Sequence, residues 1–212
     1  MEILPSLLAF WFGSLYGSFL NVIVHRLPRE ESLVRPRSRC PQCGQMIAWF
    51  DNVPILSWFF LRGRCRHCGK SISARYPLVE ASTGLLAAAL ARRWPMDPGW
   101  TVAATLACGA LLAVALIDWE TFLIPDELSV GLFVSGLLFS PINPYFAGGQ
   151  AWTAVGWSLR GAAAGFAMAW SIAALGEAAF KKEALGGGDV KLLAGVGAWA
   201  GATGAFDCLM IG

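Results

Sequence analysis

The sequence predicts an all-α polytopic membrane protein that carries a small polar loop domain. Three observations predict this class: apolar residues make up 56% of the 212-residue chain, charged residues make up only 14%, and the apolar residues fall in long blocks. Soluble domains usually carry about 25% charged residues. Several blocks approach the roughly 20 residues that an α-helix needs to cross a bilayer. A soluble protein with an unusually large core fits these observations poorly.

About six apolar segments are predicted to cross the membrane. The first covers residues 3–24. We expect it to be a retained helix, because no Lys or Arg precedes it and no small-residue cleavage site follows it. The other five are residues 76–91, 100–117, 128–142, 152–176 and a last segment that starts near Val190 and runs towards the end of the chain.

The distribution of positive charge predicts the orientation. Residues 26–75 hold ten of the sixteen Lys and Arg, and short loops rich in these residues stay in the cytoplasm. The N-terminus is then expected outside, although Arg92 and Arg93 oppose this orientation because their loop also falls outside. The expected domains are a first transmembrane helix (1–25), a cytoplasmic loop domain (26–75) and a transmembrane domain (76–212).

Four cysteines form two pairs within the polar loop. They stand in "CPQCG" (Cys40, Cys43) and "CRHCG" (Cys65, Cys68), with two residues between the thiols of each pair and a glycine after it. This spacing is typical of a zinc ribbon. Four thiolates complete a tetrahedral zinc ion and leave no open position, so the predicted site is structural. Two disulfides or an iron–sulfur cluster are the alternatives, and a cytosolic location disfavours the disulfides.

Two acids stand at the predicted cytoplasmic ends of membrane helices. Asp118 ends the third span, and Asp189 begins the sixth after Gly186, Gly187 and Gly188. An ionisable group at the centre of a membrane helix costs about 2.5–3.5 kcal/mol, which makes such groups functional candidates. The glycines would let a peptide approach Asp189, and two carboxylates that share a proton can activate water. The alternative is that both acids only mark helix ends in the headgroup region.

A series of stretches along the chain carries a resemblance to one family. The stretches are "GSFLNVIVHRLP" (17–28), "CPQCG", "DNVPILSWFFLRGRC" (51–65), "CRHCG", "RYPLVE" (75–80), "DWETFLIPD" (118–126) and "EALGGGDVKL" (183–192). In this combination they resemble the bacterial type IV prepilin peptidases, also called prepilin leader peptidase/N-methyltransferases. The combination is highly specific. The GxGD motif alone is weak, because archaeal preflagellin peptidases and presenilin-type proteases share it.

The resemblance implies an integral-membrane aspartyl endopeptidase of the bacterial inner membrane. Such enzymes cut a short basic leader from prepilins and pseudopilins after a glycine, at the cytoplasmic face. The catalytic pair maps onto Asp118 and Asp189, with Asp126 as a competitor for the first role. Helix polarity predicts that Asp189, at a helix N-terminus, acts as the base and that Asp118, at a helix C-terminus, donates a proton. Lys191 is expected to support Asp189 with positive charge.

The resemblance also implies a zinc-ribbon loop held by the four cysteines, and methylation of the new N-terminal amine by S-adenosylmethionine. The sequence contains no glycine fingerprint of a Rossmann site. The candidates for a S-adenosylmethionine site are therefore Gly17, Ser18 and Asn21, together with the 26–75 loop.

Two other functions stay open: a methyltransferase-dominant relative, and a non-enzymatic zinc-anchored membrane scaffold or transporter. The expected partners are prepilin and pseudopilin substrates and the lipid bilayer, and no nucleic acid. Members of the family usually continue with further helices after the sixth span, so the sequence is expected to be a truncated or short form.

Overall fold

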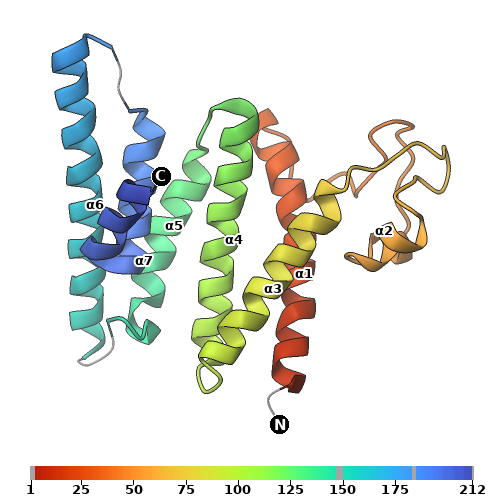
Figure 1. Cartoon of the computed structure of the whole chain (residues 1–212), viewed down its shortest axis with the longest axis horizontal. Helices are drawn as coiled ribbons and strands as arrows, with labels where there is room; N and C mark the ends of the chain where they lie inside the picture. Colours follow the sequence, from red (N-terminus) through yellow and green to blue (C-terminus); the bar gives the residue numbers. More distant parts are fainter. Residues whose placement is uncertain (1–2, 147–149, 183–184, 212) are drawn as a thin grey trace. The chain divides into compact units, whose positions relative to one another are not determined.

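The computed structural model is all-α and describes residues 3–146, 150–182 and 185–211 (Figure 1). Glu183 and Ala184, which begin the 183–192 stretch, lie outside the described residues. The α-helices of the described residues are α1 (Ile3–Arg26), α2 (Leu56–Phe60), α3 (Arg75–Arg93), α4 (Pro98–Thr121), α5 (Asp126–Phe139), α6 (Ala151–Phe180) and α7 (Gly187–Ile211). Short 3-10 helices are η1 (Leu27–Arg29), η2 (Trp49–Asn52) and η3 (Ser140–Ile142). The chain forms two compact units, residues 1–117 and 118–212.

Among the described residues, four helical segments are long and apolar enough to cross a membrane: Ile3–Arg29, Pro98–Thr121, Ala151–Phe180 and Gly187–Ile211. Each of the six predicted spans is a helix, but α3 and α5 are not in this group. Helix α5 has only 14 residues, fewer than the roughly 20 that cross a bilayer. Helix α3 carries charged side chains at both of its ends and at Glu80. The all-α prediction is confirmed, and four of the six expected spans have the composition of membrane helices.

In the first unit, small residues let α1 and α3 pack closely, with α3 tilted across α1 (Figure 1). A Cβ atom on Gly13 would lie 2.6 Å from the Cβ of Ala87, and one on Gly17 would lie 2.8 Å from the Cα of Glu80. Close backbone approach at small residues is typical of membrane helix pairs. Helix α4 joins this pair through Tyr16, whose hydroxyl donates a hydrogen bond to the carbonyl of Leu106 at 2.9 Å.

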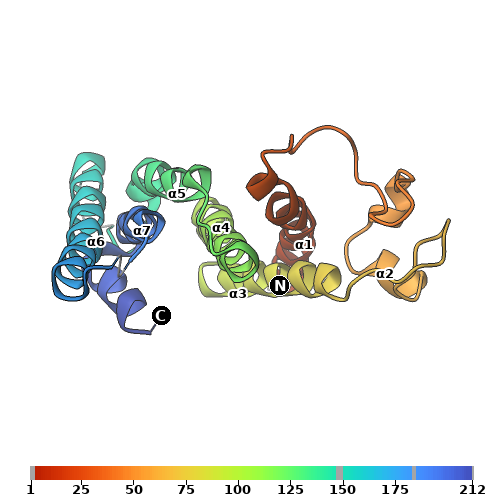
Figure 2. The same ribbon diagram turned by 90° about the horizontal axis from the view of Figure 1, so that it is seen from above.

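In the second unit, α7 packs against both α5 and α6 (Figure 2). Glycines again permit the contact. Gly161 of α6 faces the backbone of Gly197 and Gly201, and Gly165 faces the backbone of Leu193, so that a side chain at either glycine would overlap α7. The small residues that the sequence shows in these two helices therefore lie at their interface.

Helix α7 is broken at Gly201, whose backbone has φ 73° and ψ −177°. This conformation favours glycine. A break frees backbone carbonyls that must find other donors. The carbonyl of Ala198 accepts a hydrogen bond from the Ser158 hydroxyl at 2.7 Å, and that of Trp199 accepts one from the Asn143 amide at 2.9 Å.

After the break, the chain folds back along the first half of α7. Ala205 joins Val190 and Leu193 in one buried cluster, and Leu185 and Leu209 pack against it. The sixth span was expected to run on to the end of the chain. The structure corrects this expectation, because the stretch 187–200 is followed by a short return segment.

Candidate active site and metal centre

Asp189 lies in the first turn of α7 and is half-buried. Its Oδ2 accepts a hydrogen bond from the backbone N–H of Gly186 at 3.1 Å. Gly186 precedes the helix, so this bond satisfies one of the N–H groups that a helix N-terminus leaves unpaired. The carboxylate is thereby fixed at the end of the helix where partial positive charge favours an anion.

The glycines before Asp189 differ in their surroundings. A Cβ atom on Gly188 would lie 2.9 Å from the Cβ of Ile124, whereas one on Gly187 would meet nothing within 4 Å. The residue that approaches Gly188 closely is therefore Ile124, in the linker between α4 and α5. This contact brings Ile124, six residues after Asp118, next to the first turn of α7.

Asp118 is an exposed residue in the last turn of α4. Its carbonyl accepts a hydrogen bond from the N–H of Phe122 at 2.8 Å, and Phe122 takes a left-handed conformation (φ 54°) just after the helix ends. The two acids thus occupy the helix ends that the sequence predicted, and both belong to the unit formed by residues 118–212. Their joint action stays a prediction.

Asp126, at the start of α5, forms an ion pair with Lys191 of α7. The Nζ of Lys191 lies 2.8 Å from Oδ1 and 2.7 Å from Oδ2 of Asp126. Lys191 was expected to add positive charge near Asp189, but its ammonium group binds Asp126. The pair therefore joins the first turn of α5 to the second turn of α7.

An apolar cleft of about 390 Å³ opens between α5, α6 and α7. Phe133 and Phe166 line it with several alanines, and Lys191 also contributes to its wall. Because Lys191 follows Asp189 by two residues, the cleft begins close to the first turn of α7.

The four predicted ligand cysteines meet in one cluster. Their Sγ atoms all lie within 4.8 Å of one another, and those of Cys40 and Cys68 are 3.9 Å apart. Thiolates bound at about 2.3 Å to a tetrahedral zinc ion would lie roughly 3.8 Å apart, so the cluster has the size of a single-ion site. The four thiols are free, and the two disulfides considered from the sequence are not formed.

The two cysteine pairs fold in the same way. The N–H of Gly44 donates to the carbonyl of Cys40 at 2.9 Å, and the N–H of Gly69 donates to that of Cys65 at 2.9 Å. Both glycines have positive φ, 71° and 68°, which explains why a glycine follows each pair.

Backbone N–H groups within these turns favour the thiolate form. Burial raises the pKa of the Cys40 thiol, but hydrogen bonds from the N–H groups of Cys43 and Gln42 outweigh it, and the pKa falls to about 7. The pKa of Cys65 is lowered by the N–H groups of Cys68 and His67. Metal ligation needs thiolates, so these bonds prepare the cluster for a cation.

An ion pair ties the second cysteine pair to the 51–58 segment. Arg66 donates from Nε to Oδ2 of Asp51 at 2.7 Å and from Nη2 to Oδ1 at 2.6 Å. These two hydrogen bonds lower the pKa of the Asp51 carboxyl. Arg66 follows Cys65 directly, so the position of the cysteine cluster is coupled to that of the 51–58 segment.

All three S-adenosylmethionine candidates contact α3. Gly17 lies against the backbone of α3, and the Asn21 amide donates to the carbonyls of Gly17 at 3.2 Å and Tyr76 at 3.3 Å. These contacts give Gly17 and Asn21 a role in packing α1 on α3. A cofactor site formed by them together with Ser18 stays a prediction.

Glu80 was not identified from the sequence. It is only 8% exposed, and its Oε2 accepts a hydrogen bond from the N–H of Ile55 at 2.7 Å. The hydroxyl of Ser18 also bonds to it. A carboxylate inside a predicted span is a costly feature, and this signal alone was sufficient to single out Glu80.

Comparison with known proteins covers both units. Residues 11–94 match the bacterial peptidase A24 N-terminal domain, and residues 105–212 match the type IV leader peptidase family. A prepilin leader peptidase/N-methyltransferase of Aeromonas hydrophila is 41% identical over 219 residues, which cover 92% of this chain and 72% of the relative. A protein of the same name from Klebsiella pneumoniae is 43% identical over 199 residues, covering 91% and 83%. One from Myxococcus xanthus is 42% identical over 193 residues, covering 90% and 54%.

No solved structure matches the chain. The sequence matches nevertheless cover most of its length and confirm the resemblance that the motifs predicted. The chain belongs to the type IV leader peptidase family.

Proposed function

We propose that this chain is a membrane aspartyl endopeptidase that removes the basic leader of prepilins and pseudopilins and methylates the new N-terminus. Family membership and the names of the relatives support this function. The observation that best supports this function is the position of the Asp189 side chain. Its carboxylate is held by the Gly186 N–H in the first turn of α7, beside the Ile124 linker that leads back to Asp118.

Asp189 and Asp118 take different parts in the proposed reaction. Asp189, at a helix N-terminus, removes a proton from the attacking water. Asp118, at a helix C-terminus, donates a proton to the carbonyl oxygen of the scissile peptide. The two carboxyls titrate as a unit. The ion pair of Asp126 with Lys191 supports Asp118 over Asp126 for this role, because Asp126 is already engaged.

The proposed location is the bacterial inner membrane, with the active site facing the cytoplasm. The positive charge of the 26–75 loop supports this orientation. The proposal includes six membrane-crossing segments: α1, α3 and α4 in the first unit, and α5, α6 and the 187–200 stretch of α7 in the second. The division into residues 1–25, 26–75 and 76–212 is part of the same proposal.

Two cofactors belong to the proposal. A structural zinc ion would be held by Cys40, Cys43, Cys65 and Cys68, whose Sγ atoms form one cluster. The lowered thiol pKa values of Cys40 and Cys65 also fit a cation. When bound, zinc would join the two turns of the loop, and S-adenosylmethionine would supply the methyl group. Ser18 and the loop beside it are the proposed surroundings of S-adenosylmethionine.

One experiment separates the candidate functions. Purified protein in detergent is incubated with a prepilin and S-adenosylmethionine, and mass spectrometry follows loss of the leader and gain of one methyl group. The proposal predicts both changes. Methylation of a pre-cleaved pilin without leader loss would favour a methyltransferase-dominant protein. The absence of both changes would favour a scaffold or transporter.

A further inference from the structure

The loop between α1 and α3 exposes a compact group of large apolar side chains. We call the side chains of Trp49, Phe50, Leu56, Phe59 and Phe60 the aromatic patch. They lie on η2 and α2, and all are exposed, with Phe60 83% and Trp49 74% accessible. Large contiguous apolar surfaces on a protein mark contacts with a partner or a membrane.

A hydrogen bond connects the segment that carries the aromatic patch to α3. Ile55, directly before α2, donates its N–H to the buried carboxylate of Glu80 on α3 at 2.7 Å. Glu80 also accepts a bond from Ser18 of α1. The bond from Ile55 therefore fixes the start of α2 to the place where α1 and α3 meet.

The backbone at Ile55 must be held to keep this conformation. Ile55 has φ 63° and ψ −56°, a region that β-branched residues rarely occupy and that persists only where the surroundings enforce it. Beside it, the hydroxyl of Ser57 accepts a bond from the N–H of Val53 at 3.0 Å and donates one to the carbonyl of Phe50 at 3.0 Å. The loop is thus shaped to present α2 in one orientation.

Glu80 bonds to Ser18 of α1, and the position of Ser18 along α1 gives the depth of the aromatic patch. Ser18 precedes Val24, where the apolar run of α1 ends, by six residues, which is about 9 Å along a helix axis. If α1 crosses the bilayer as its length and composition indicate, Ile55 is held about 9 Å inside that end of the span. Interfacial helices bury their apolar faces about 5–10 Å into the boundary between headgroups and acyl chains.

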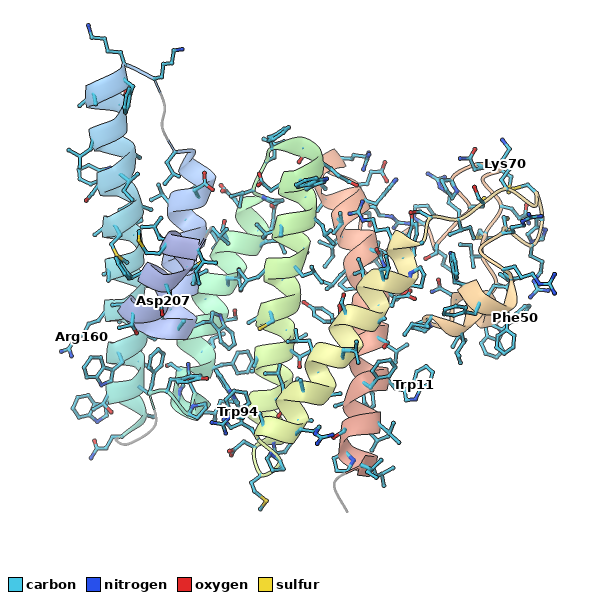
Figure 3. All side chains as sticks on the ribbon, viewed as in Figure 1. Trp11, Phe50, Lys70, Trp94, Arg160 and Asp207 are labelled. Atoms are coloured by element: carbon cyan, nitrogen blue, oxygen red, sulfur yellow. The ribbon has the colours of Figure 1, made fainter. Side chains whose placement is uncertain are left out.

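The charge of the loop complements an anionic surface. Residues 26–75 hold ten Lys and Arg against three acids. Figure 3 shows Phe50 on the side of the loop towards the N-terminal end of α1, and Lys70 on the opposite side. Arg62 and Arg64 follow Phe60 closely in sequence. Phe50 thus lies on the side of the loop that faces the bilayer, and Lys70 lies on the side where anionic headgroups would be.

We propose that the aromatic patch lies in the bilayer interface, with the basic residues of the loop at anionic lipid headgroups and Glu80 as the residue that holds the patch at this depth. The loop that contains the cysteine cluster would then lie against the membrane surface and would not extend into the aqueous phase. The inference depends on α1 spanning the bilayer and is independent of the peptidase chemistry.

The first test uses photo-crosslinking in the full chain. A benzoylphenylalanine is placed at position 60 or, as a matched control, at position 70, and the protein is reconstituted in nanodiscs of phosphatidylcholine and phosphatidylglycerol. Position 60 should form lipid adducts several times more often than position 70. Equal yields at the two positions, or adducts to protein in place of lipid at position 60, would overturn the proposal.

The second test concerns Glu80. Glu80→Ala should reduce the lipid adducts at position 60 several-fold, whereas Glu80→Gln, whose amide oxygen still accepts a bond from Ile55, should retain most of them. Ile55→Gly should restore part of the yield in the Glu80→Ala background, because glycine takes this conformation without strain. Unchanged yields in well-behaved Glu80→Ala protein would refute the role of Glu80.

A third measurement needs no variant. Trypsin should cut the unmodified chain at Arg62 and Arg64 several times more slowly in nanodiscs containing phosphatidylglycerol than in nanodiscs of phosphatidylcholine alone. Equal cutting rates in the two lipids would contradict the proposed contact with anionic headgroups.

Discussion

The ammonium group of Lys191 in α7 contacts both carboxylate oxygens of Asp126 in α5, at 2.8 and 2.7 Å. The pair links α7, which carries Asp189, to α5. The side chains of Lys191 and Asp126 are 49% and 62% exposed, and exposed ion pairs contribute only about 0–1 kcal/mol. We therefore expect Asp126 to act as a structural partner of α7 and not as a member of the proposed catalytic pair.

This contact predicts small and non-additive effects on catalysis. Asp126→Asn and Lys191→Met should each lower kcat/KM for leader cleavage by no more than about fivefold, the equivalent of about 1 kcal/mol. The double variant should lose no more than the worse single variant, because both substitutions remove the same interaction. If Asp126→Asn is as inactive as Asp118→Asn, Asp126 belongs to the catalytic pair and the assignment is wrong.

The glycines before Asp189 provide a matched pair of substitutions. Gly188→Ala places a Cβ against Ile124 and should displace Asp189, whereas Gly187→Ala places a Cβ in open space. Misplacement of a catalytic group by about 1 Å can reduce the rate by about a hundredfold. Gly188→Ala should therefore lower kcat/KM by about tenfold or more, and Gly187→Ala should stay near the parent value.

A second substitution controls for the cause of this loss. Ile124→Ala removes the side chain that the new Cβ would meet, so the Gly188→Ala/Ile124→Ala protein should regain much of its activity. An equal loss in Gly187→Ala and Gly188→Ala would show that the contact with Ile124 is not what matters.

The cysteine cluster predicts about one zinc ion per chain in protein prepared without chelators. Cys40→Ser should lower the metal content and expose the 26–75 loop to protease, because the ion joins the two turns of that loop. Cys108→Ser is the control, since Cys108 lies in α4 and outside the cluster. Inductively coupled plasma mass spectrometry gives the metal content. Protein that contains neither zinc nor iron would refute the metal centre.

The ion pair between Asp51 and Arg66 predicts a kinetic effect on metal retention. The hydrogen bonds from Arg66 lower the pKa of Asp51, so the carboxylate is charged at neutral pH and the pair contributes there. Asp51→Asn should release zinc to a chelator several times faster than the parent does, with a colorimetric reagent as the readout. Asp97→Asn, a substitution outside the loop, should behave like the parent. Equal release rates for Asp51→Asn and the parent would show that the pair does not brace the cluster.

Much of the fold follows from local sequence. The apolar runs predict a helix at every expected span, because membrane helices need continuous apolar stretches. The spacing of Cys40, Cys43, Cys65 and Cys68 predicts their cluster, because two turns of this type bring four thiols to one ion. The glycine after each cysteine pair is explained by the positive φ that the structure shows there.

Other features depend on which distant segments meet, and sequence patterns do not specify this. The break at Gly201 lies in a run whose composition is alike on both sides, and its carbonyls are satisfied by Ser158 and Asn143 from other elements. The partner of Lys191 is set by how α5 packs on α7. Glu80 and Ile55 are 25 residues apart, and nothing local to either residue predicts their hydrogen bond.

Asp118 and Asp189 are proposed to act as one catalytic pair. This proposal is tested most directly by kcat/KM for prepilin cleavage in Asp118→Asn, Asp189→Asn and the double variant, with Asp97→Asn as the control. Each single variant should lose about a thousandfold or more, and the double variant should lose little beyond that, because the two groups work as a unit. A single variant that keeps the parent rate, or losses that multiply in the double variant, would contradict it.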